Sequence, residues 1–394
     1  MIVRRGSGFA FLLGVGLLAV GYVVAARFGY IERVQARFFP RLQRGARLSA
    51  GDFPAGVAAP VGELASIPLR PTLIGFTPRG SSAALLLATG GIYPSQPDQR
   101  ERATSGLLKV AYSLDARAIV FAREEELRKA LAFGAENGGV DMAAVSVDRL
   151  AHWWNLLRDA SPRVILLLGR SNGQEALAGV GVQHLAGLRG KRIAAHLQGS
   201  PYYFTLWALS RVALGIHDVK FVELSSSLEA GSALREGRAD AAAGYLADVE
   251  LAARDRGGKV LATTADAPHL ISTVLAVRGE FAARYPGAVR RILRGLLDAA
   301  ASVRRDSTDG ARLLGEVAPY LGDPSEAIRS APPADLKENL AFFSLSGESP
   351  VTYDELFQSA AALFMKIGKT NGVPAAEDTR DVSPLRYVSE TRRP

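Results

Sequence analysis

The chain has 394 residues, of which 48% are hydrophobic and 22% are charged, so it can bury a large core and is too apolar to be disordered. It contains no cysteine, which excludes disulfide scaffolds, thiolate metal sites, cysteine catalysis and an anchor on an acylated cysteine. Residues 1–50 hold eight arginines and one acidic residue, so most of the net charge of +8 lies there and the remaining body lacks the basic surface that nucleic-acid binding requires.

The N-terminal part of the chain predicts a membrane segment. Residues 1–8 form a short basic start, and residues 9–26 form an uncharged run of 18 residues, which just spans a bilayer as a helix. Two interpretations stay open: an uncleaved transmembrane anchor, or a signal peptide cut after Val24-Ala25-Ala26. The length of the run favours the anchor, because signal peptides have shorter apolar regions. The arginines that follow the run conflict with an anchor that leaves the rest of the chain outside the cytoplasm, because they favour a cytoplasmic C-terminal side.

Residues 27–71 are predicted to be a basic juxtamembrane segment and a linker. The part from Arg27 to Leu48 mixes arginines with aromatic residues, and fits either an anionic membrane surface or a solvated arm. The part from Leu48 to Pro71 contains four prolines and has no sustained apolar period, which is typical of a semi-extended linker.

From Thr72 onwards short apolar runs alternate with helical patterns, which predicts an α/β fold with mostly parallel sheets. The predicted strands are 72–76, 107–112, 118–121, 140–145, 163–168, 192–197, 219–224, 239–245, 259–264 and 270–277. The predicted helices are 83–88, 124–133, 148–157, 201–214, 228–236, 246–254, 281–285, 288–304, 310–320, 333–344 and 353–367.

A weak internal repeat predicts two similar lobes. In each copy the end of a helix leads through a glycine-containing turn to an aspartate and a strand of small residues, Asp141–Ser146 in one copy and Asp240–Tyr245 in the other. Aligning the aspartates places Ser146 opposite Tyr245, each just past the carboxyl end of a strand, where ligands bind in open α/β sheets. We therefore expect Tyr245 to be a partly packed cleft residue. Chance similarity between two helix–turn–strand units is the alternative.

Several motifs occur in a fixed order in the second half of the body. Gly187–Ala194 reads Gly-Leu-Arg-Gly-Lys-Arg-Ile-Ala, and it is followed by Gly199–Phe204, Gly231–Ala241 and Lys259–Thr264. In these motifs the chain resembles the periplasmic solute-binding proteins of ABC importers for nitrate, sulfonates and taurine, a group related to the thiamine-pyrimidine-precursor binders. The resemblance is ordered from about residue 162 to residue 297 and is looser over 72–161.

The resemblance implies a type II periplasmic-binding-protein fold, in which two α/β lobes joined by hinge strands enclose one cleft. The first lobe would contain residues 72–168, the second 169–268, and residues 269–394 would return to the first lobe and add C-terminal helices. The hinge strands would be 163–168 and 271–277. Two departures leave the ligand open: Gly244-Tyr245-Leu246 stands where relatives often have Trp-Glu-Pro, and the polar stretch 94–106 replaces a short link.

Two helix starts predict a site for an anion. Ser200 precedes Pro201 and is expected to cap a helix, and Gly80-Ser81-Ser82 opens a helix after the first strand. Backbone N–H groups and the positive end of the dipole bind anions at such starts, although ordinary capping is an equal alternative. The candidate ligand-binding residues are Thr77, Arg79, Gly80, Ser81, Ser82, Ser113, Ser146, Gly199, Ser200 and Tyr245.

Catalytic, metal and cofactor sites are not predicted. A phosphate-loop-like run at 188–192 lacks the required first glycine and the final Ser or Thr, and the five histidines show no metal-ligand spacing. The leading hypothesis is a membrane-tethered solute-binding protein, which captures a small anion such as a sulfonate for an ABC permease. Its folded domain would be periplasmic on a single-pass inner-membrane helix, with a secreted form as the alternative. The competing hypotheses are a membrane-anchored sensor or scaffold that keeps the fold without transport and, less favoured, an enzyme.

Overall fold

The computed structural model describes residues 66–92 and 106–391, so the predicted membrane segment 9–26 and most of the predicted segment 27–71 lie outside the described residues. Within the described ranges the strands form two five-stranded sheets. No helix in those ranges is both long enough and apolar enough to cross a bilayer.

The first sheet has the strand order β2-β1-β3-β10-β4. Strand β1 is parallel to its neighbours β2 and β3, whereas β10 is antiparallel to both β3 and β4. Every residue of β3 is buried, as expected for a strand covered on both faces. The strands are β1 (Thr72–Phe76), β2 (Ala116–Val120), β3 (Met142–Ser146), β4 (Arg163–Arg170) and β10 (Ser272–Val277).

The second sheet has the order β7-β6-β8-β5-β9 and repeats the topology of the first. Strand β6 is parallel to β7 and β8, and β5 is antiparallel to β8 and β9. Strand β8 therefore occupies the place of β3, which is the equivalence that the internal repeat predicts. The strands are β5 (Glu175–Gly179), β6 (Arg192–Ala195), β7 (Lys220–Glu223), β8 (Ala241–Tyr245) and β9 (Lys259–Thr263).

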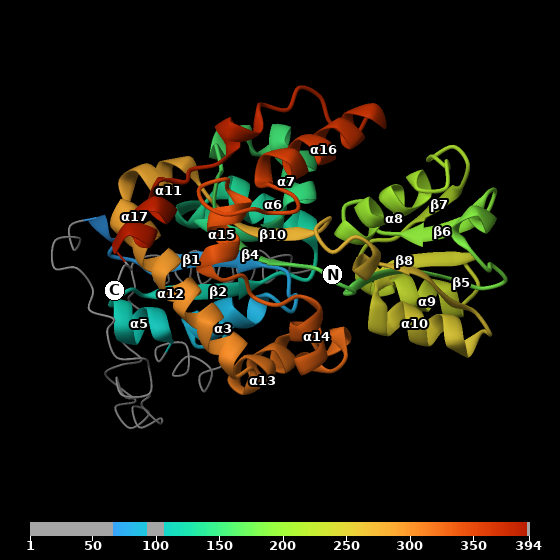
Figure 1. The fold of residues 1–394 in the computed structure, drawn as a ribbon, viewed down its shortest axis with the longest axis horizontal. Coiled ribbons are helices and arrows are strands. Elements are labelled where there is room, and N and C mark those ends of the chain that lie inside the picture. The colour runs from blue at the N-terminus through green and yellow to red at the C-terminus, as the bar shows by residue number, and fades with distance from the viewer. Residues whose placement is uncertain (1–65, 93–105, 392–394) are drawn as a thin grey trace, which may run out of the picture. The chain divides into compact units, whose positions relative to one another are not determined.

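Helices cover both faces of each sheet, and each sheet with its helices is called a lobe below. In the first lobe α3 (Ser82–Thr89) packs on α12 (Pro286–Arg305), while α7 (Val147–Trp153) covers the other face (Figure 1). In the second lobe α8 (Ser200–Ser210) and α10 (Leu246–Asp255) cover opposite faces (Figure 1). The other α-helices are α5 (Leu107–Tyr112), α6 (Glu124–Phe133), α9 (Ala230–Arg235), α11 (Gly279–Arg284), α13 (Thr308–Val317), α14 (Pro324–Ser330), α15 (Leu336–Phe342), α16 (Tyr353–Lys366) and α17 (Ser383–Thr391).

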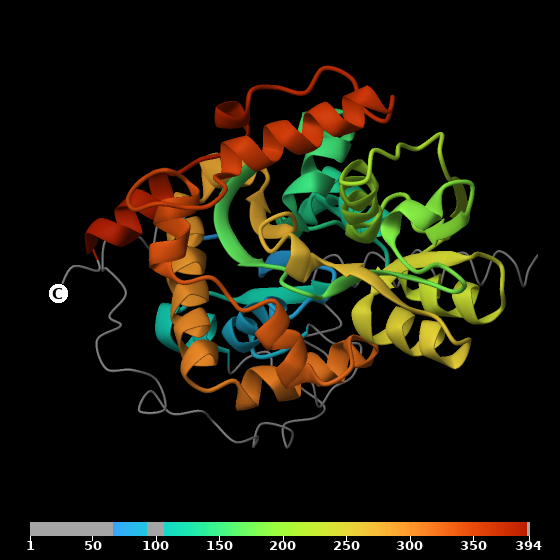
Figure 2. The ribbon, with the colours of Figure 1, turned by 45° about the vertical axis from the view of Figure 1, so that its right-hand side comes forward.

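Helix α16 connects the two lobes on one side of the molecule. It packs along α7 and extends toward α8 (Figure 2). Its Phe364 ring stacks on the His152 ring of α7, with the ring centroids 4.5 Å apart, and lies 5.7 Å from the ring of Tyr203 on α8. The C-terminal helices thus contribute side chains to both lobes.

The chain crosses between the sheets twice. It leaves the first sheet after Arg170 and enters the second at Glu175, and it returns between Thr263 and Ser272. The predicted hinge strand 163–168 falls within β4, and 271–277 coincides with β10 except for residue 271; β4 and β10 pair with each other in the first sheet. The crossings themselves are the short segments beyond those strands, and the Ser171 N–H joins them by donating to the carbonyl of Ile271 at 2.9 Å.

The segment Leu107–Tyr112, predicted as a strand, is helix α5. Leu108 and Tyr112 are both buried, and their spacing of four places them on one face of a helix that packs on α3 and α12. The prediction was wrong because a six-residue apolar run has the same appearance in a strand and in a buried helical turn. The neighbouring helices decide which of the two forms.

Candidate functional site

Arg79 lies in the loop after β1. Of the candidate residues in that loop, it is the one whose described side-chain contacts include the second lobe. The residue is 3% exposed. Its guanidinium Nη1 pairs with the Glu175 carboxylate, and its Nη2 donates to the Ser200 hydroxyl at 3.0 Å. Its backbone N–H donates to the Ser82 hydroxyl at 3.0 Å, which fixes the loop at the start of α3. Arg79 is therefore bound to both lobes.

Ser146 and Ser200 meet across the boundary between the lobes. Ser146 ends β3, Ser200 begins α8, and their hydroxyl oxygens are 2.8 Å apart. The predicted role of Ser200 as a helix cap is wrong, because Gly199 is the N-cap residue of α8. The Ser200 hydroxyl instead faces Arg79 and Ser146. The arrangement brings together three of the candidate residues, and we call Arg79, Ser146, Ser200 and Glu175 the interlobe site.

Glu175 is the member of the interlobe site that sequence reasoning missed. It is the first residue of β5 and is 0% exposed. Its second carboxylate oxygen accepts from the hydroxyls of Ser171 and, at 3.3 Å, of Thr264. These two residues belong to the two crossings, and their hydroxyl oxygens are 2.7 Å apart. The carboxylate is thus held by the hinge and directed at Arg79.

The charge on Arg79 is stabilised despite its burial. Removal from water favours the neutral form, but Glu175, followed by smaller effects of Tyr245, Glu124 and Asp148, outweighs that cost and raises the pKa of Arg79 above its usual value. The guanidinium therefore stays charged at every pH at which the protein is folded.

A second buried ion pair lies at the start of α7, directly after Ser146. Arg149 Nε donates to Asp148 Oδ2 at 2.7 Å, and the two side chains are 1% and 0% exposed. The other Asp148 oxygen, Oδ1, and Arg149 Nη2 are buried and have no hydrogen-bond partner among the described residues. Buried polar atoms normally find partners, so these two atoms mark a place where a partner is missing.

A histidine–carboxylate cluster joins the lobes on another side. His196 follows β6, and its Nε2 lies 3.3 Å from Glu125 and 3.7 Å from Glu124, which begin α6. Burial works against the charged ring, but Glu125, the Leu224 carbonyl and Glu124 outweigh it and raise the pKa of His196. Burial also raises the pKa of Glu124. No group of three or more His, Asp or Glu side chains in the described part of the chain is arranged to hold a metal ion.

Tyr245 lies at the lobe boundary but is more deeply packed than expected. It is 5% exposed, and its ring lies 5.4 Å from that of Tyr320 in the short helix Pro319–Leu321 of the first lobe. Burial raises the pKa of the Tyr245 hydroxyl. Both rings line a cavity of about 240 Å³. The expectation of a partly packed residue is therefore wrong, since only a small part of the ring reaches solvent.

The remaining candidates fall into two groups. Gly80 and Ser81 lie beside the interlobe site, but a Cβ on Gly80 would lie 1.8 Å from the Ala327 carbonyl oxygen, so packing against α14 explains this glycine. Gly199 is similarly crowded by Ser227. Thr77 follows β1 and is half-buried. Ser113 lies apart, because it is exposed and precedes the amino end of β2, whereas Arg79, Ser146 and Ser200 lie at or after the carboxyl ends of β1, β3 and β6.

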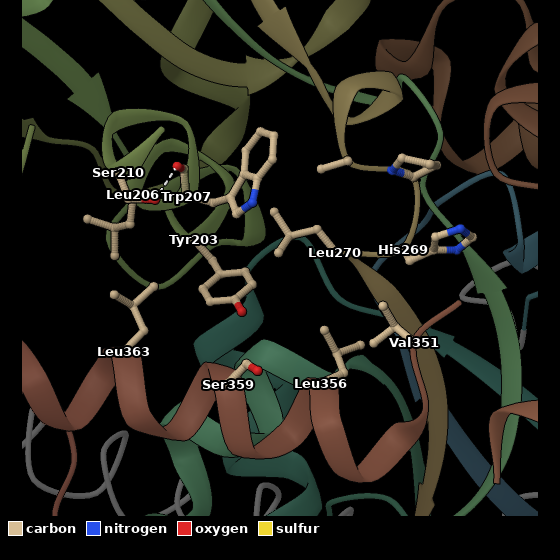
Figure 3. Close-up of a pocket in the computed structure, with 12 residues that line it drawn as sticks. Tyr203, Leu206, Trp207, Ser210, His269, Leu270, Val351, Leu356, Ser359 and Leu363 are labelled. Atoms are coloured by element: carbon tan, nitrogen blue, oxygen red, sulfur yellow. Dashed lines mark hydrogen bonds between the residues drawn. The ribbon is translucent and has the colours of Figure 1, made fainter. Parts of the chain in front are cut away.

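A larger cavity of about 480 Å³ lies between α8, the second crossing and α16, and it contains none of the candidate residues. The side chains of Tyr203, Leu270 and Leu356 converge in it (Figure 3). Most of its lining is apolar. It is separate from the interlobe site in its residues and in its chemistry.

Comparison with known proteins supports the family resemblance inferred from the sequence. Residues 170–307 match the model of a family described as NMT1/THI5 like. No sequence among curated proteins matches the chain significantly. The sequence resemblance to this group of proteins is thereby confirmed for the matched stretch.

Solved structures show the same fold at low sequence identity. The alkanesulfonate-binding protein SsuA from Xanthomonas axonopodis pv. citri, bound to MOPS, is 18% identical with a TM-score of 0.59, over 80% of this chain and 99% of that one. The periplasmic nitrate-binding protein NrtA from Synechocystis PCC 6803 is 12% identical with a TM-score of 0.60, over 82% and 89%. The desulfurization enzyme DSZB is 15% identical with a TM-score of 0.56, over 82% and 100%. The chain therefore has the two-sheet periplasmic-binding-protein fold.

Proposed function

We propose that this chain is a solute-binding protein, which captures a small molecule at the interlobe site and delivers it to an ABC importer. The observation that carries the proposal is the meeting of Arg79, Ser146 and Ser200 from different sheets within hydrogen-bond distance. Ser146 ends β3, and Arg79 and Ser200 lie in the segments that follow the carboxyl ends of β1 and β6, which is where open α/β sheets bind ligands. The sulfonate- and nitrate-binding proteins of the same fold support this role.

The ligand carries an anionic group in this proposal. A guanidinium presents several N–H donors in a planar fork that matches carboxylate, sulfonate and phosphate oxygens, and the two serine hydroxyls add donors beside it. The lobes close around the ligand by bending at the two crossings, where Ser171 and Thr264 lie. Closure then removes the bound group from water and strengthens its contact with Arg79.

Binding is favoured over catalysis by the state of the nearby titratable groups. The chain has no cysteine nucleophile. The His196 ring is engaged by the Leu224 carbonyl and lies beside the carboxylates of Glu124 and Glu125. A sensor or scaffold of the same fold is the competing function, and it differs in having no transported ligand.

We further propose that the body is tethered outside the inner membrane by the uncharged run 9–26, with an ABC permease as its partner. Mass spectrometry of the native membrane fraction should then find the intact N-terminus. A start at Arg27 would instead indicate a cleaved signal peptide. A reporter fused to the C-terminus should be active outside the cytoplasm, and cytoplasmic activity would contradict transport.

The binding proposal is tested with the full-length chain and a panel of small sulfonates, carboxylates and amino acids. A ligand should raise the melting temperature, because binding to the folded state alone stabilises it by mass action. Ser200→Ala should weaken that ligand about tenfold, since it removes a hydroxyl beside the Arg79 guanidinium. Ser113→Ala is the matched control and should bind like the parent. A panel in which no solute stabilises the parent would contradict transport and favour the sensor or scaffold.

A further inference from the structure

Arg79, the proposed receiver of an anionic group, already has an anionic partner within the protein. The Glu175 carboxylate pairs with Nη1, and Ser200 accepts from Nη2. The side chains of the pair are 4% and 0% exposed. An arriving anion must therefore share the guanidinium with Glu175 or displace it.

The fate of Glu175 then decides which ligands can bind. When the lobes close on a ligand with only an anionic group, the Glu175 carboxylate stays buried without a counter-charge, and this is strongly unfavourable. Its neighbours Ser171 and Thr264 offer hydroxyls but no positive charge. A ligand with only a cationic group would pair with Glu175 and leave the charge of Arg79 buried without a counter-charge. A ligand that carries both charges compensates both side chains.

The second buried pair points to a ligand with both kinds of polar group. Asp148 and Arg149 neutralise each other, yet one carboxylate oxygen and one guanidinium nitrogen remain without a partner among the described residues. These leftover atoms are an anionic acceptor and a cationic donor on the helix that begins after Ser146. An acceptor and a donor that are left over beside Ser146 favour a ligand that itself offers both a donor and an acceptor.

We propose that the interlobe site selects a zwitterion, with an anionic group for Arg79 and a cationic nitrogen for Glu175, and that Glu175 is the residue that determines this specificity. The inference rests on the proposed function. It narrows the class of ligand from any small anion to a molecule that carries both a negative and a positive charge. It predicts that simple anions bind poorly to the natural protein and better once the Glu175 charge is removed.

Two pairs of probes, matched in size, test the inference on the full-length chain by calorimetry. Each pair shares its anionic group and differs only in an ammonium or a hydroxyl: 2-aminoethanesulfonate against 2-hydroxyethanesulfonate, and 3-aminopropanoate against 3-hydroxypropanoate. In at least one pair the natural protein should bind the zwitterion at least about tenfold more tightly, a difference of about 1.4 kcal/mol. Glu175→Gln should bind the simple anion more tightly than the parent and lose the preference. Glu125→Gln, at the same lobe boundary but without contact to Arg79, should keep it.

Each outcome has a defined meaning. Equal affinity of the natural protein for both members of every pair, or a preference that survives in Glu175→Gln, overturns the inference but leaves the proposed function intact. Failure of all four probes to bind either protein also overturns it. The comparison on the natural protein needs no variant, so a folding defect in Glu175→Gln does not remove the test. The broader solute panel tests the proposed function separately, because it does not depend on the charge type of the ligand.

Discussion

At the scale of single residues, the sequence identified one side of the interlobe site and missed the other. Arg79, Ser146 and Ser200 were found because each lies next to a predicted strand end or helix start. Glu175 gave no such signal, since its partner Arg79 lies 96 positions away and only the fold brings them together. Ser113 lies apart from the other candidates, because its neighbours in sequence do not tell at which end of the sheet it lies.

Tyr245 provides a test of how tightly the lobe boundary is packed. Tyr245→Ala should lower the free energy of unfolding by about 3 kcal/mol, because it removes a buried ring that lies against Tyr320. Tyr245→Phe keeps the ring and should cost much less. Denaturant unfolding of both variants gives the comparison. An alanine variant as stable as the parent would show that the ring is exposed at the boundary.

At the scale of secondary-structure elements, strands that alternate with helices were predicted well, and exceptions have physical causes. Strand β4, which is apolar between its two terminal arginines, and the amphipathic helix α6 have unambiguous patterns. Strand β5 was missed because its sequence, Glu-Ala-Leu-Ala-Gly, combines a charge with weak strand formers, although all five residues are buried. Helix α14 was missed because its seven residues show too few turns for a periodic pattern.

The contact between the start of α3 and α14 can be tested at Gly80. Gly80→Ala should destabilise the protein by about 1–3 kcal/mol or more, because the new Cβ would lie 1.8 Å from a backbone oxygen of Ala327, which cannot rotate away. Gly215→Ala is the matched control, since its Cβ would meet only Asp218 at 3.9 Å. Thermal unfolding of the two variants should separate them clearly. Equal melting temperatures would mean that α14 does not pack on Gly80.

At the scale of the whole molecule, the two lobes share one topology. Ion pairs between charged side chains join them, in addition to apolar contacts. The repeat of strand order explains why equivalent strand ends, after β3 and β8, lie at the lobe boundary. The sequence predicted this duplication from two short segments. It did not predict the ion pairs Arg79–Glu175 and His196–Glu125, because each joins residues of different lobes.

The pair between His196 and Glu125 should make stability depend on pH. The folded-state pKa of His196 is raised, so its contribution is fully present below the unfolded value of about 6.5 and is lost as the pH rises through the folded pKa. The pKa of Glu125 is lowered, so its contribution is lost only when the pH falls below about 4.3. Melting temperatures of the parent and His196→Gln should differ most between these limits and converge in alkaline buffer.

The exposed histidine His217 supplies the control for this measurement. His217→Gln should follow the parent across the whole pH range. A difference between the parent and His196→Gln that grows as the pH rises would contradict the sign of the shift and the assignment of His196 as a charged partner.

If the interlobe site binds an anionic ligand as proposed, the attachment of Glu175 to the hinge also affects how quickly that ligand leaves. A carboxylate that is part of the chain has an effective concentration at Arg79 that does not fall when the surrounding solution is diluted. It therefore competes with the anionic end of a bound molecule at every moment of the cycle. Each time the lobes loosen, the tethered group can recapture the guanidinium before the solute rebinds, which shortens the residence time of the cargo. In the proposed function, such a binding protein would trade tight retention of its ligand for rapid release.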